Sequence, residues 1–164
     1  MHITNQSRHK LRNSDGISLK IVRIENDRRS FMPLLLIGDE SETMIDLYID
    51  RGELFAAFAG KTVAAVCLTT DEGNGITEIK NIAVKPEFRQ RGIGSRMLRH
   101  VESLNAGKII TLGTGETPST LRFYHSNGYR YSHRVPDFFT DNYPTPIVEE
   151  GVRLKDMIYL SKQL

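Results

Sequence analysis

The sequence predicts a mixed α/β fold, and three features carry this prediction. Between residues 77 and 112 a strand-like apolar run, an amphipathic helix and a second apolar run follow one another. Before that segment, two further apolar runs flank a Gly60-Lys61 turn, which is the pattern of an antiparallel hairpin. The chain of 164 residues suits one domain with a substantial core. We therefore expect a flexible leader over residues 1–16 and a single domain over residues 17–164.

Composition excludes several classes of function. With 39% apolar and 26% charged residues, the chain has the composition of an ordinary globular protein. A net charge of +2 is too small to favour nucleic acid as a partner. No apolar run is long enough to cross a membrane, and five histidines without ligand spacing predict no metal site. The single cysteine, Cys67, fits a reducing cytoplasm, so we expect a cytoplasmic protein without membrane or nucleic-acid partners.

The N-terminal third predicts one strand and two helices. The alternating apolar residues at positions 17–24 predict the strand. A helix capped by Asn26 or Asp27 follows, which Pro33 shortens or breaks and Gly38 ends. A second helix is expected over residues 39–51.

Acidic residues dominate the second of these helices. The acidic positions are Asp39, Glu40, Glu42, Asp46, Asp50 and Glu53, against the single base Arg51. A solvated helix face is the commoner explanation of such a run. A negative rim that attracts a cationic amine is the functional alternative, and both interpretations stay open.

The segment from Thr77 to Glu102 organises the predicted domain. Its strand ends before a proline, and a loop with Arg89, Arg91, Gly92 and Gly94 follows. From Ser95 the period becomes helical, with Met97, Leu98, Val101 and Leu104 on the apolar face and Arg96, Arg99 and Glu102 outside it. A helix N-terminus beside two arginines predicts an anion site, most naturally for phosphate.

Two familiar phosphate motifs do not fit this loop. A P-loop requires a lysine between the last glycine and the serine, but Ser95 follows Gly94 directly. A dinucleotide fingerprint requires a third glycine, and Met97 occupies that position. What remains is the pattern Arg-x-x-Gly-x-Gly after the segment Asn81–Pro86.

This combination closely resembles motif A of the GNAT superfamily of acetyl-CoA-dependent N-acetyltransferases, in which the loop holds the coenzyme A pyrophosphate. The resemblance implies acetyl-CoA as the cosubstrate. It also implies a twisted mixed sheet of six to seven strands, with a splayed parallel central pair and helices on both faces. The cofactor-binding residues implied by the resemblance are Ile82, Ala83, Val84, Arg89, Gln90, Arg91, Gly92, Ile93, Gly94, Ser95 and Thr117.

The central strand carries a change of phase. Its apolar residues fall on odd positions at Ile79 and on even positions at Ile82 and Val84. One extra residue near Lys80–Asn81 restores the phase, as a β-bulge does, and the resembling family has a bulge there. A strand buried on both faces is the alternative explanation.

The C-terminal half predicts a second signature. Residues 108–112 form a strand parallel to the central one, because a strand–helix–strand crossover of this length requires it. Thr117 and Pro118 begin a helix, and Leu121–Tyr129 resembles the family signature Phe-Tyr-x-x-x-Gly-Phe. Many members carry an asparagine at the start of this helix, where Thr117 is the nearest match.

The remaining chain predicts two strands and a proline-rich loop. The strands are expected over residues 129–135 and 152–160, with the loop at 136–146. The segment from Asp137 to Met157 resembles a subgroup of small bacterial GNAT proteins. Because many relatives pair through their C-terminal strands, a homodimer through residues 152–160 stays open.

The resemblance also assigns the chemistry. Tyr124 is the candidate acid that protonates the leaving thiolate, and Glu78 matches the general base of some family members. Aromatic packing and an ordinary polar strand position are the respective alternatives, and a water chain replaces the base in many members. We expect direct attack of a small-molecule primary amine on acetyl-CoA in a ternary complex. Acetylation of a protein N-terminus or lysine, and a non-catalytic coenzyme A sensor, are the alternatives.

Overall fold

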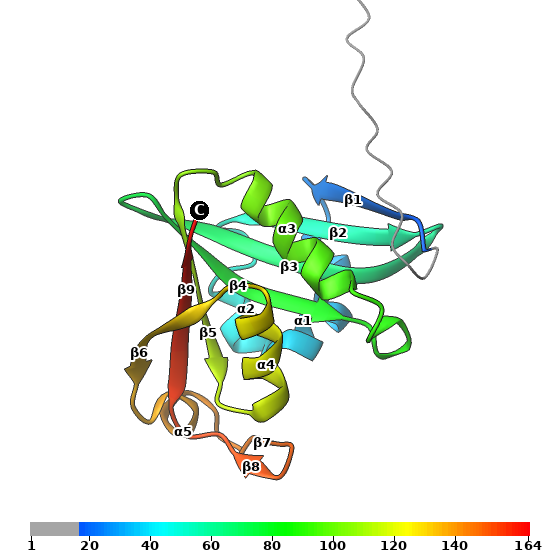
Figure 1. The fold of residues 1–164 in the computed structure, drawn as a ribbon. Coiled ribbons are helices and arrows are strands. Elements are labelled where there is room, and N and C mark those ends of the chain that lie inside the picture. The colour runs from blue at the N-terminus through cyan, green and yellow to red at the C-terminus, as the bar shows by residue number, and fades with distance from the viewer. Residues whose placement is uncertain (1–16) are drawn as a thin grey trace, which may run out of the picture.

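The structure, a computed structural model, describes residues 17–164, so the predicted leader lies outside the described residues. Its main sheet has seven strands in the order β1-β2-β3-β4-β5-β9-β6 (Figure 1). These strands are β1 (Leu19–Ile24), β2 (Glu53–Ala59), β3 (Thr62–Gly73), β4 (Ile76–Val84), β5 (Ile109–Gly115), β6 (Arg130–Val135) and β9 (Met157–Gln163). Within this sheet β4 and β5 pair in parallel, and the other pairs are antiparallel.

Helices cover both faces of the sheet, as the sequence predicts (Figure 1). One face carries α3 (Ile93–Ser103) and α4 (Pro118–Ser126), and the other carries α1 (Met32–Gly38) and α2 (Glu42–Asp46). The smaller elements are the 3-10 turns η1 (Arg28–Phe31) and η2 (Pro86–Phe88), helix α5 (Phe138–Asn142), and a hairpin of β7 (Val148–Glu149) and β8 (Val152–Arg153). The predicted mixed α/β fold is confirmed.

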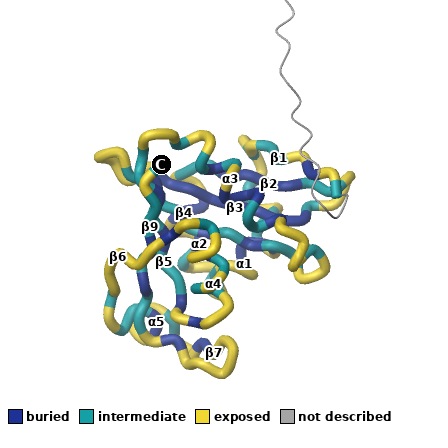
Figure 2. Tube along the Cα trace, in the orientation of Figure 1, coloured by how far each residue is buried: buried dark blue, intermediate teal, exposed yellow. Residues whose placement is uncertain are grey.

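Buried apolar residues form one core layer on each face of the sheet. Figure 2 shows where the buried residues lie along the chain. On the α3 side the layer includes Met97, Leu98 and Val101 of that helix. A third, small cluster of Phe139, Ile147 and Leu154 lies apart from both layers. This third cluster fixes α5 and the β7–β8 hairpin against each other, and they build part of the site described below.

The predicted bulge is present in β4. Leu68 of β3 pairs with Asn81, and the next residue of β3, Thr69, pairs with Ile79, so Lys80 is the extra residue. As a result Ile79 before the bulge, and Ile82 after it, pack against the same core layer. The bulge explains the change of phase in the sequence.

The parallel pair separates halfway along its length. Strands β4 and β5 pair from Ile76–Ile109 to Ile79–Leu112, and no pairing follows. Beyond that point β4 continues to Val84 while β5 stays paired with β9. A V-shaped opening therefore lies between the two strands, with the edge of β4 unpaired on that side.

Two N-terminal predictions require correction. The helix expected over residues 39–51 is only the five-residue α2, because Ser41 caps it and turns follow Asp46. Asp27 makes no side-chain cap; its backbone has a φ of 53° and starts a 3-10 turn. Pro33 lies in the first turn of α1, where its missing N–H costs nothing, and the helix is short and ends at Gly38, as expected.

Further corrections concern α3 and the C-terminal strand. Arg96, expected outside the apolar face, is only 7% exposed, whereas Leu104 is 55% exposed because it follows the last turn of the helix. The strand expected over residues 152–160 is two elements, β8 and β9. Because β9 pairs with β5 and with β6, it offers no free edge to a second copy of the chain.

Candidate active site

Two pockets lie side by side at the opening between β4 and β5. The larger pocket has a volume of about 480 Å³ and the smaller pocket about 250 Å³. Their walls share Ile37, Ile82, Thr120 and Tyr124. A group that reaches the end of one pocket therefore meets the other pocket at these four residues.

The loop before α3 forms one end of the larger pocket. Gly92 has a φ of +72°, a conformation that side chains with a Cβ rarely adopt, and it leads directly into the helix. No side chain caps this N-terminus among residues 17–164. The N–H groups of the first turn, at Ile93, Gly94 and Ser95, are thus not capped by a side chain, which is the arrangement that an anionic ligand requires.

Gly94 has a packing role in addition to its place in the pocket wall. A Cβ at this position would lie 3.0 Å from Cζ of Phe123 on α4, so its lack of a side chain lets α4 pack closely against α3. Close helix packing, and not approach to a ligand alone, explains the second glycine of the motif.

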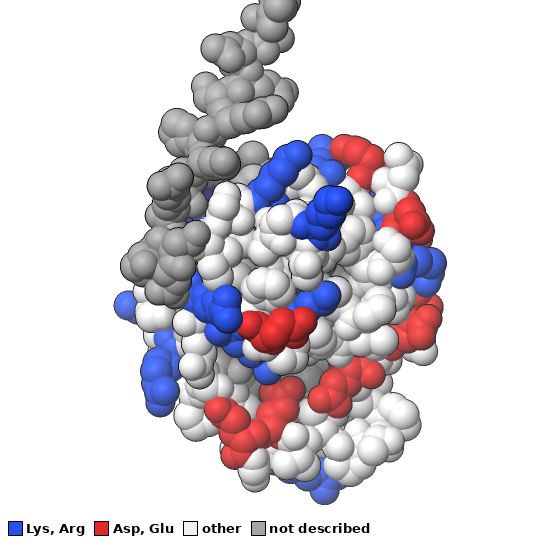
Figure 3. Space-filling view, turned by 90° about the vertical axis from the view of Figure 1, so that its right-hand side faces the viewer, with Lys and Arg blue, Asp and Glu red and all other residues white. Residues whose placement is uncertain are grey.

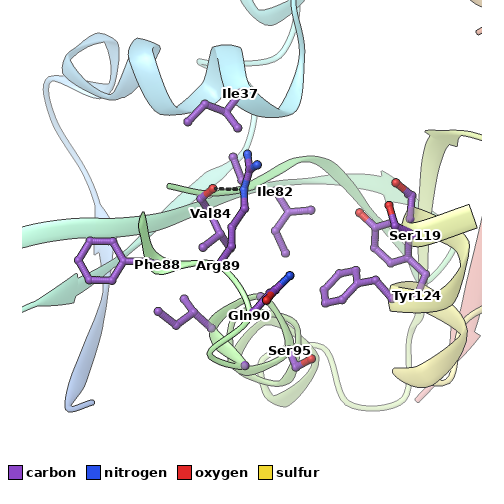
Figure 4. Close-up of a pocket in the computed structure, with 15 residues that line it drawn as sticks. Ile37, Ile82, Val84, Phe88, Arg89, Gln90, Ser95, Ser119 and Tyr124 are labelled. Carbon is purple, nitrogen blue, oxygen red and sulfur yellow. Dashed lines mark hydrogen bonds between the residues drawn. The ribbon is translucent and has the colours of Figure 1, made fainter. Parts of the chain in front are cut away.

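The unpaired edge of β4 forms a second wall of the larger pocket. Lys85 donates its N–H to Ala64 on β3 at 2.8 Å. Because peptide groups alternate along a strand, the N–H groups of Ile82 and Val84 point to the opposite side, toward the opening. Arg89 Nε donates to the Val84 carbonyl at 3.3 Å, which holds the guanidinium at this edge (Figure 4). An extended ligand can add to this edge as a strand would.

Most of the predicted cofactor residues line the larger pocket. Those that do are Ile82, Ala83, Val84, Arg89, Gln90, Gly92, Ile93, Gly94 and Ser95. Arg91 and Thr117 are not in its wall. The guanidinium of Arg91 lies 5.9 Å from the centre of the Phe88 ring. The residues that the sequence reasoning missed are Ile37, Phe88, Ser119, Thr120 and Phe123.

Thr117 precedes α4 without capping it. Its side chain is buried, and its hydroxyl donates to that of Thr120 at 2.9 Å. Instead, the β7–β8 hairpin supplies a side-chain acceptor for the first turn of α4. Glu150 accepts a hydrogen bond from the N–H of Ser119 at 3.2 Å. A carboxylate at a helix N-terminus is favourable, but this one comes from a distant segment that local sequence could not indicate.

Tyr124 stands where the two pockets meet. It is 8% exposed, and its ring packs edge-on against Phe123 and Tyr129. In the described structure its hydroxyl makes no hydrogen bond, and Figure 4 shows Tyr124 on α4 facing Ile82 on β4. Burial, and secondarily the nearby Cys67, raises the pKa of Tyr124 well above its ordinary value. The phenol therefore stays protonated at neutral pH.

Glu78, the predicted base, lines neither pocket. Its Oε2 lies 3.0 Å from Lys80 Nζ, and its Oε1 accepts a hydrogen bond from Tyr159 at 3.4 Å. Lys80 does line the smaller pocket. Glu78 is thus paired with a residue of the wall but is not itself in the wall.

The smaller pocket is built from five segments far apart in the sequence. They are the α1–α2 connection, the end of β4, the end of β5, helix α4, and the segment from α5 to the start of β9. A hydrogen bond joins the first and the last of them: Tyr143 donates to Asp39 Oδ1 at 2.7 Å, across 104 positions in the chain. Tyr48 donates to Oδ2 of the same carboxylate at 3.2 Å. Burial, and then Asp39, raises the pKa of Tyr143.

The predicted acidic rim reaches the site only in part. Asp39 and Glu40 line the smaller pocket. Asp46 instead pairs with Arg29 at 2.8 Å and Glu53 with Arg23 at 2.9 Å. The pocket gains a carboxylate that the sequence reasoning missed, Glu149 of the β7–β8 hairpin. In Figure 3 acidic side chains gather below the central hollow and basic ones lie mainly above it.

Residues 17–164 offer no candidate metal cluster and no candidate membrane-spanning helix. That part of the chain holds no group of three or more His, Cys, Asp or Glu side chains placed to bind a metal ion. None of its helices combines the length and apolar character needed to cross a membrane.

The family assignment follows from similarity to known proteins. The profile described as "Acetyltransferase (GNAT) domain" matches residues 50–131, half of the chain. YvbK from Bacillus subtilis (strain 168), an uncharacterised N-acetyltransferase, is 32% identical over 147 residues, which cover 87% of this chain and 94% of that protein. The chain belongs to the GNAT superfamily of acetyltransferases. Its predicted family and enzyme class are confirmed.

Solved GNAT structures match nearly the whole described chain. A GNAT family acetyltransferase from Elizabethkingia anophelis with acetyl-CoA bound has a TM-score of 0.83 and 33% identity, covering 89% of this chain and 98% of that one. An IAA acetyltransferase from Bacillus cereus ATCC 14579 has a TM-score of 0.82 and 32% identity, covering 90% and 100%. A Bacillus subtilis acetyltransferase in complex with CoA has a TM-score of 0.80 and 32% identity, covering 89% and 99%. The cofactor expected from the sequence is thus the one found in similar GNAT structures.

Proposed function

We propose that this GNAT protein transfers the acetyl group of acetyl-CoA to a primary amine of a small molecule, by direct attack in a ternary complex. One observation carries the proposal: the larger and smaller pockets share part of their walls at Tyr124 and Ile82. Acetyl-CoA in the larger pocket and an amine in the smaller pocket would meet there, so no acetylated enzyme is needed.

Groups along the larger pocket are complementary to three parts of acetyl-CoA: the pyrophosphate, the pantetheine arm and the thioester. The pyrophosphate would lie at the N-terminus of α3 beside Arg89, and the pantetheine amides would bond the free edge of β4 at Ile82 and Val84. The N–H of Ile82 would then lie near the thioester and stabilise the oxyanion that develops on its carbonyl.

The reaction requires two proton movements. The neutral amine attacks the carbonyl carbon, a C–N bond forms, the C–S bond breaks, and the thiolate takes a proton. Tyr124 is the proposed donor, because burial keeps its hydroxyl protonated and it stands where the pockets meet.

The amine must also lose a proton, and Glu78 is the proposed acceptor. Since Glu78 lies outside the wall of the smaller pocket and is paired with Lys80, the proton would have to pass through a water molecule. We expect Glu78→Gln to lower kcat about tenfold, less than loss of a base in direct contact would. An unchanged kcat in this variant would assign the role to solvent.

The shape of the smaller pocket favours a small molecule over a peptide. Its volume of about 250 Å³ is below the range typical of drug-sized ligands, roughly 300–1,000 Å³. The hydrogen bond between Tyr143 and Asp39 joins its two sides, where an extended peptide would need an open groove. This contact is the feature that disfavours acetylation of a protein N-terminus or lysine.

Titration calorimetry with acetyl-CoA, followed by an amine panel scored for free thiol, tests the proposal. We expect binding near micromolar Kd and thiol release with particular amines, in amounts equal to the acetylated product. Binding without release by any amine would favour the sensor alternative. A short peptide that releases thiol faster than every small amine would favour a protein substrate.

A further inference from the structure

We infer that Asn81 is a positioning residue, whose side-chain amide holds the Ile82 N–H in the direction that stabilises the thioester oxyanion. The inference rests on the proposed function, in which Ile82 supplies that N–H, and it adds a residue that acts through the backbone of its neighbour. It follows from a closed ring of hydrogen bonds between α1 and β4 and from the close approach of Gly38.

The ring joins Asn81, Leu35, Asp39 and Tyr48. The Nδ2 of Asn81 donates to the Leu35 carbonyl at 2.8 Å and to the Tyr48 hydroxyl at 3.0 Å. The Tyr48 hydroxyl donates to Asp39 Oδ2 at 3.2 Å, and the N–H of Asp39 donates to the same Leu35 carbonyl at 3.0 Å. Because a carbonyl oxygen can only accept, the Leu35 contact fixes which side of the amide faces α1. Burial raises the pKa of Tyr48, so its hydroxyl stays protonated at neutral pH and serves both bonds.

The backbone of β4 at Asn81 has weak support within the sheet. Its pairing with β5 ends at Ile79, and the bulge at Lys80 interrupts its pairing with β3 just before Asn81. The Ile82 N–H belongs to the planar peptide unit that begins at Asn81, so a rotation at Asn81 turns this N–H. A side chain fixed at two points by its Nδ2 restricts that rotation where strand pairing does not.

Gly38 lets the end of α1 lie directly against the same peptide units. A Cβ at Gly38 would overlap Asn81 Oδ1 and would lie 3.1 Å from the Ile82 carbonyl oxygen. Gly38 is not among the glycines with positive φ, so its missing side chain serves this close packing and not an unusual backbone conformation. Helix α1 therefore holds the bulge both through the ring and through direct contact at Gly38.

This close fit has a cost. The Oδ1 of Asn81 is buried against Gly38 and has no hydrogen-bond donor in the described structure. Buried acceptors are normally satisfied, and exceptions concentrate where a functional geometry is maintained. An unsatisfied oxygen next to the proposed oxyanion donor indicates that this amide serves the geometry of the bulge more than the stability of the fold.

Three substitutions disturb this arrangement in different ways. Asn81→Ala removes both Nδ2 bonds, and Tyr48→Phe removes a hydroxyl that lies outside the walls of both pockets. Gly38→Ala removes no hydrogen-bonding group and favours the helix, but its Cβ displaces Asn81.

Each of the three should lower kcat without weakening the cofactor complex. We expect kcat to fall at least about tenfold in Asn81→Ala and Gly38→Ala and about threefold in Tyr48→Phe, because a single oxyanion donor commonly contributes about 100-fold. The Kd of acetyl-CoA should stay within about twofold, since the contacts proposed for its pyrophosphate and pantetheine are kept. Should Asn81→Ala fail to fold, Tyr48→Phe carries the same test with the aromatic ring in place.

Asn105→Ala is the matched control. The Nδ2 of Asn105 donates to the Val101 carbonyl in the last turn of α3 at 2.8 Å, and its Oδ1 accepts from the Thr77 hydroxyl of β4 at 2.8 Å. It therefore also joins a helix end to β4, but near the other end of the strand and outside both pocket walls. Its loss should lower the melting temperature and leave kcat unchanged.

The infrared carbonyl band of acetyl-CoA, isotopically labelled at the thioester carbonyl, measures the positioning directly. A donor aimed at the carbonyl oxygen lowers the stretching frequency, so the bound band should lie below the free one in the wild type and in Asn105→Ala. In Asn81→Ala and Gly38→Ala it should move back toward the free value.

The results separate this inference from the proposed function. A wild-type band that equals the free one, a shift that survives in Asn81→Ala, or equal kcat losses in Asn81→Ala and Asn105→Ala would overturn the role of Asn81 while thiol release by the wild type continued. A wild-type protein that releases thiol with no amine would instead overturn the proposed function itself.

Discussion

The two pockets differ in how the chain builds them. Most of the wall of the larger pocket comes from one continuous segment, residues 82–95, and much of its binding capacity is main-chain: a strand edge and a helix N-terminus. The smaller pocket is lined by five segments that are distant in the sequence and are held together by contacts such as Tyr143–Asp39. A cofactor common to a family can be held by local backbone geometry, whereas acceptor specificity depends on side chains that the fold brings together.

The largest expected effect on acetyl-CoA affinity comes from changing the backbone of the larger pocket. Gly92→Val forces a β-branched residue to a φ of +72°, so the first turn of α3 must move. We expect acetyl-CoA affinity, measured by calorimetry, to fall about 100-fold or more.

Gly107→Val is the control for this variant. Gly107 has a φ of +80° with open space around it, in the turn after α3 and outside both pockets. It carries a comparable strain, so an equal loss of binding in both variants would point to general misfolding and contradict a specific role for Gly92.

The next effect is at the junction of the two pockets. Tyr124→Phe should lower kcat about 100-fold while leaving the Kd of acetyl-CoA within about twofold, because it removes a proton donor but keeps the ring. As the pKa of Tyr124 is raised above its ordinary value of about 10, its ionisation should cause no loss of kcat below pH 10 in the wild type. Tyr131→Phe, at an exposed tyrosine of β6, is the control, and full activity in Tyr124→Phe would remove the acid assignment.

The third prediction tests whether the two pockets bind different substrates. Tyr143→Phe removes the hydroxyl that joins the two sides of the smaller pocket through Asp39. Hydrogen bonds to charged groups contribute about 1.5–3 kcal/mol, so we expect the KM for the amine to rise about tenfold in initial-rate assays. The KM for acetyl-CoA should not change, and a parallel rise in both values would contradict the division into two pockets.

The smallest effect distinguishes the two arginines of the motif. Arg89 lines the larger pocket and is held at the edge of β4, whereas Arg91 is not in the wall. Arg89→Ala should weaken acetyl-CoA binding about tenfold, most strongly at low salt, and Arg91→Ala only about twofold. Calorimetry at two salt concentrations measures both, and the reverse order would mean that Arg91 turns inward when the cofactor binds.

The same contrast explains what the sequence could predict. The loop at Gly92 depends on residues that follow one another, and the bulge at Lys80 is visible in the apolar phase of a single strand, so both were accessible. Gly94 was assigned to the right place but with an incomplete role, because its packing partner Phe123 lies on another helix.

The acceptor side could be predicted only in part. The acidic residues from Asp39 to Glu53 are adjacent in sequence, but arginines from β1 and η1 pair with some of them, and Glu149 reaches the pocket from more than 100 positions away. Glu78 matched the family base by position, yet it pairs with Lys80 and lies outside the pocket wall. Such partners are set by tertiary packing, for which the chain gives no local signal.

Initial rates measured over a matrix of acetyl-CoA and amine concentrations test the central claim, that two adjoining pockets are filled at once, most directly. Double-reciprocal plots should give lines that intersect, with free coenzyme A competing against acetyl-CoA and not against the amine. Parallel lines, together with a protein acetylated by acetyl-CoA alone, would show transfer through a covalent intermediate and contradict the account.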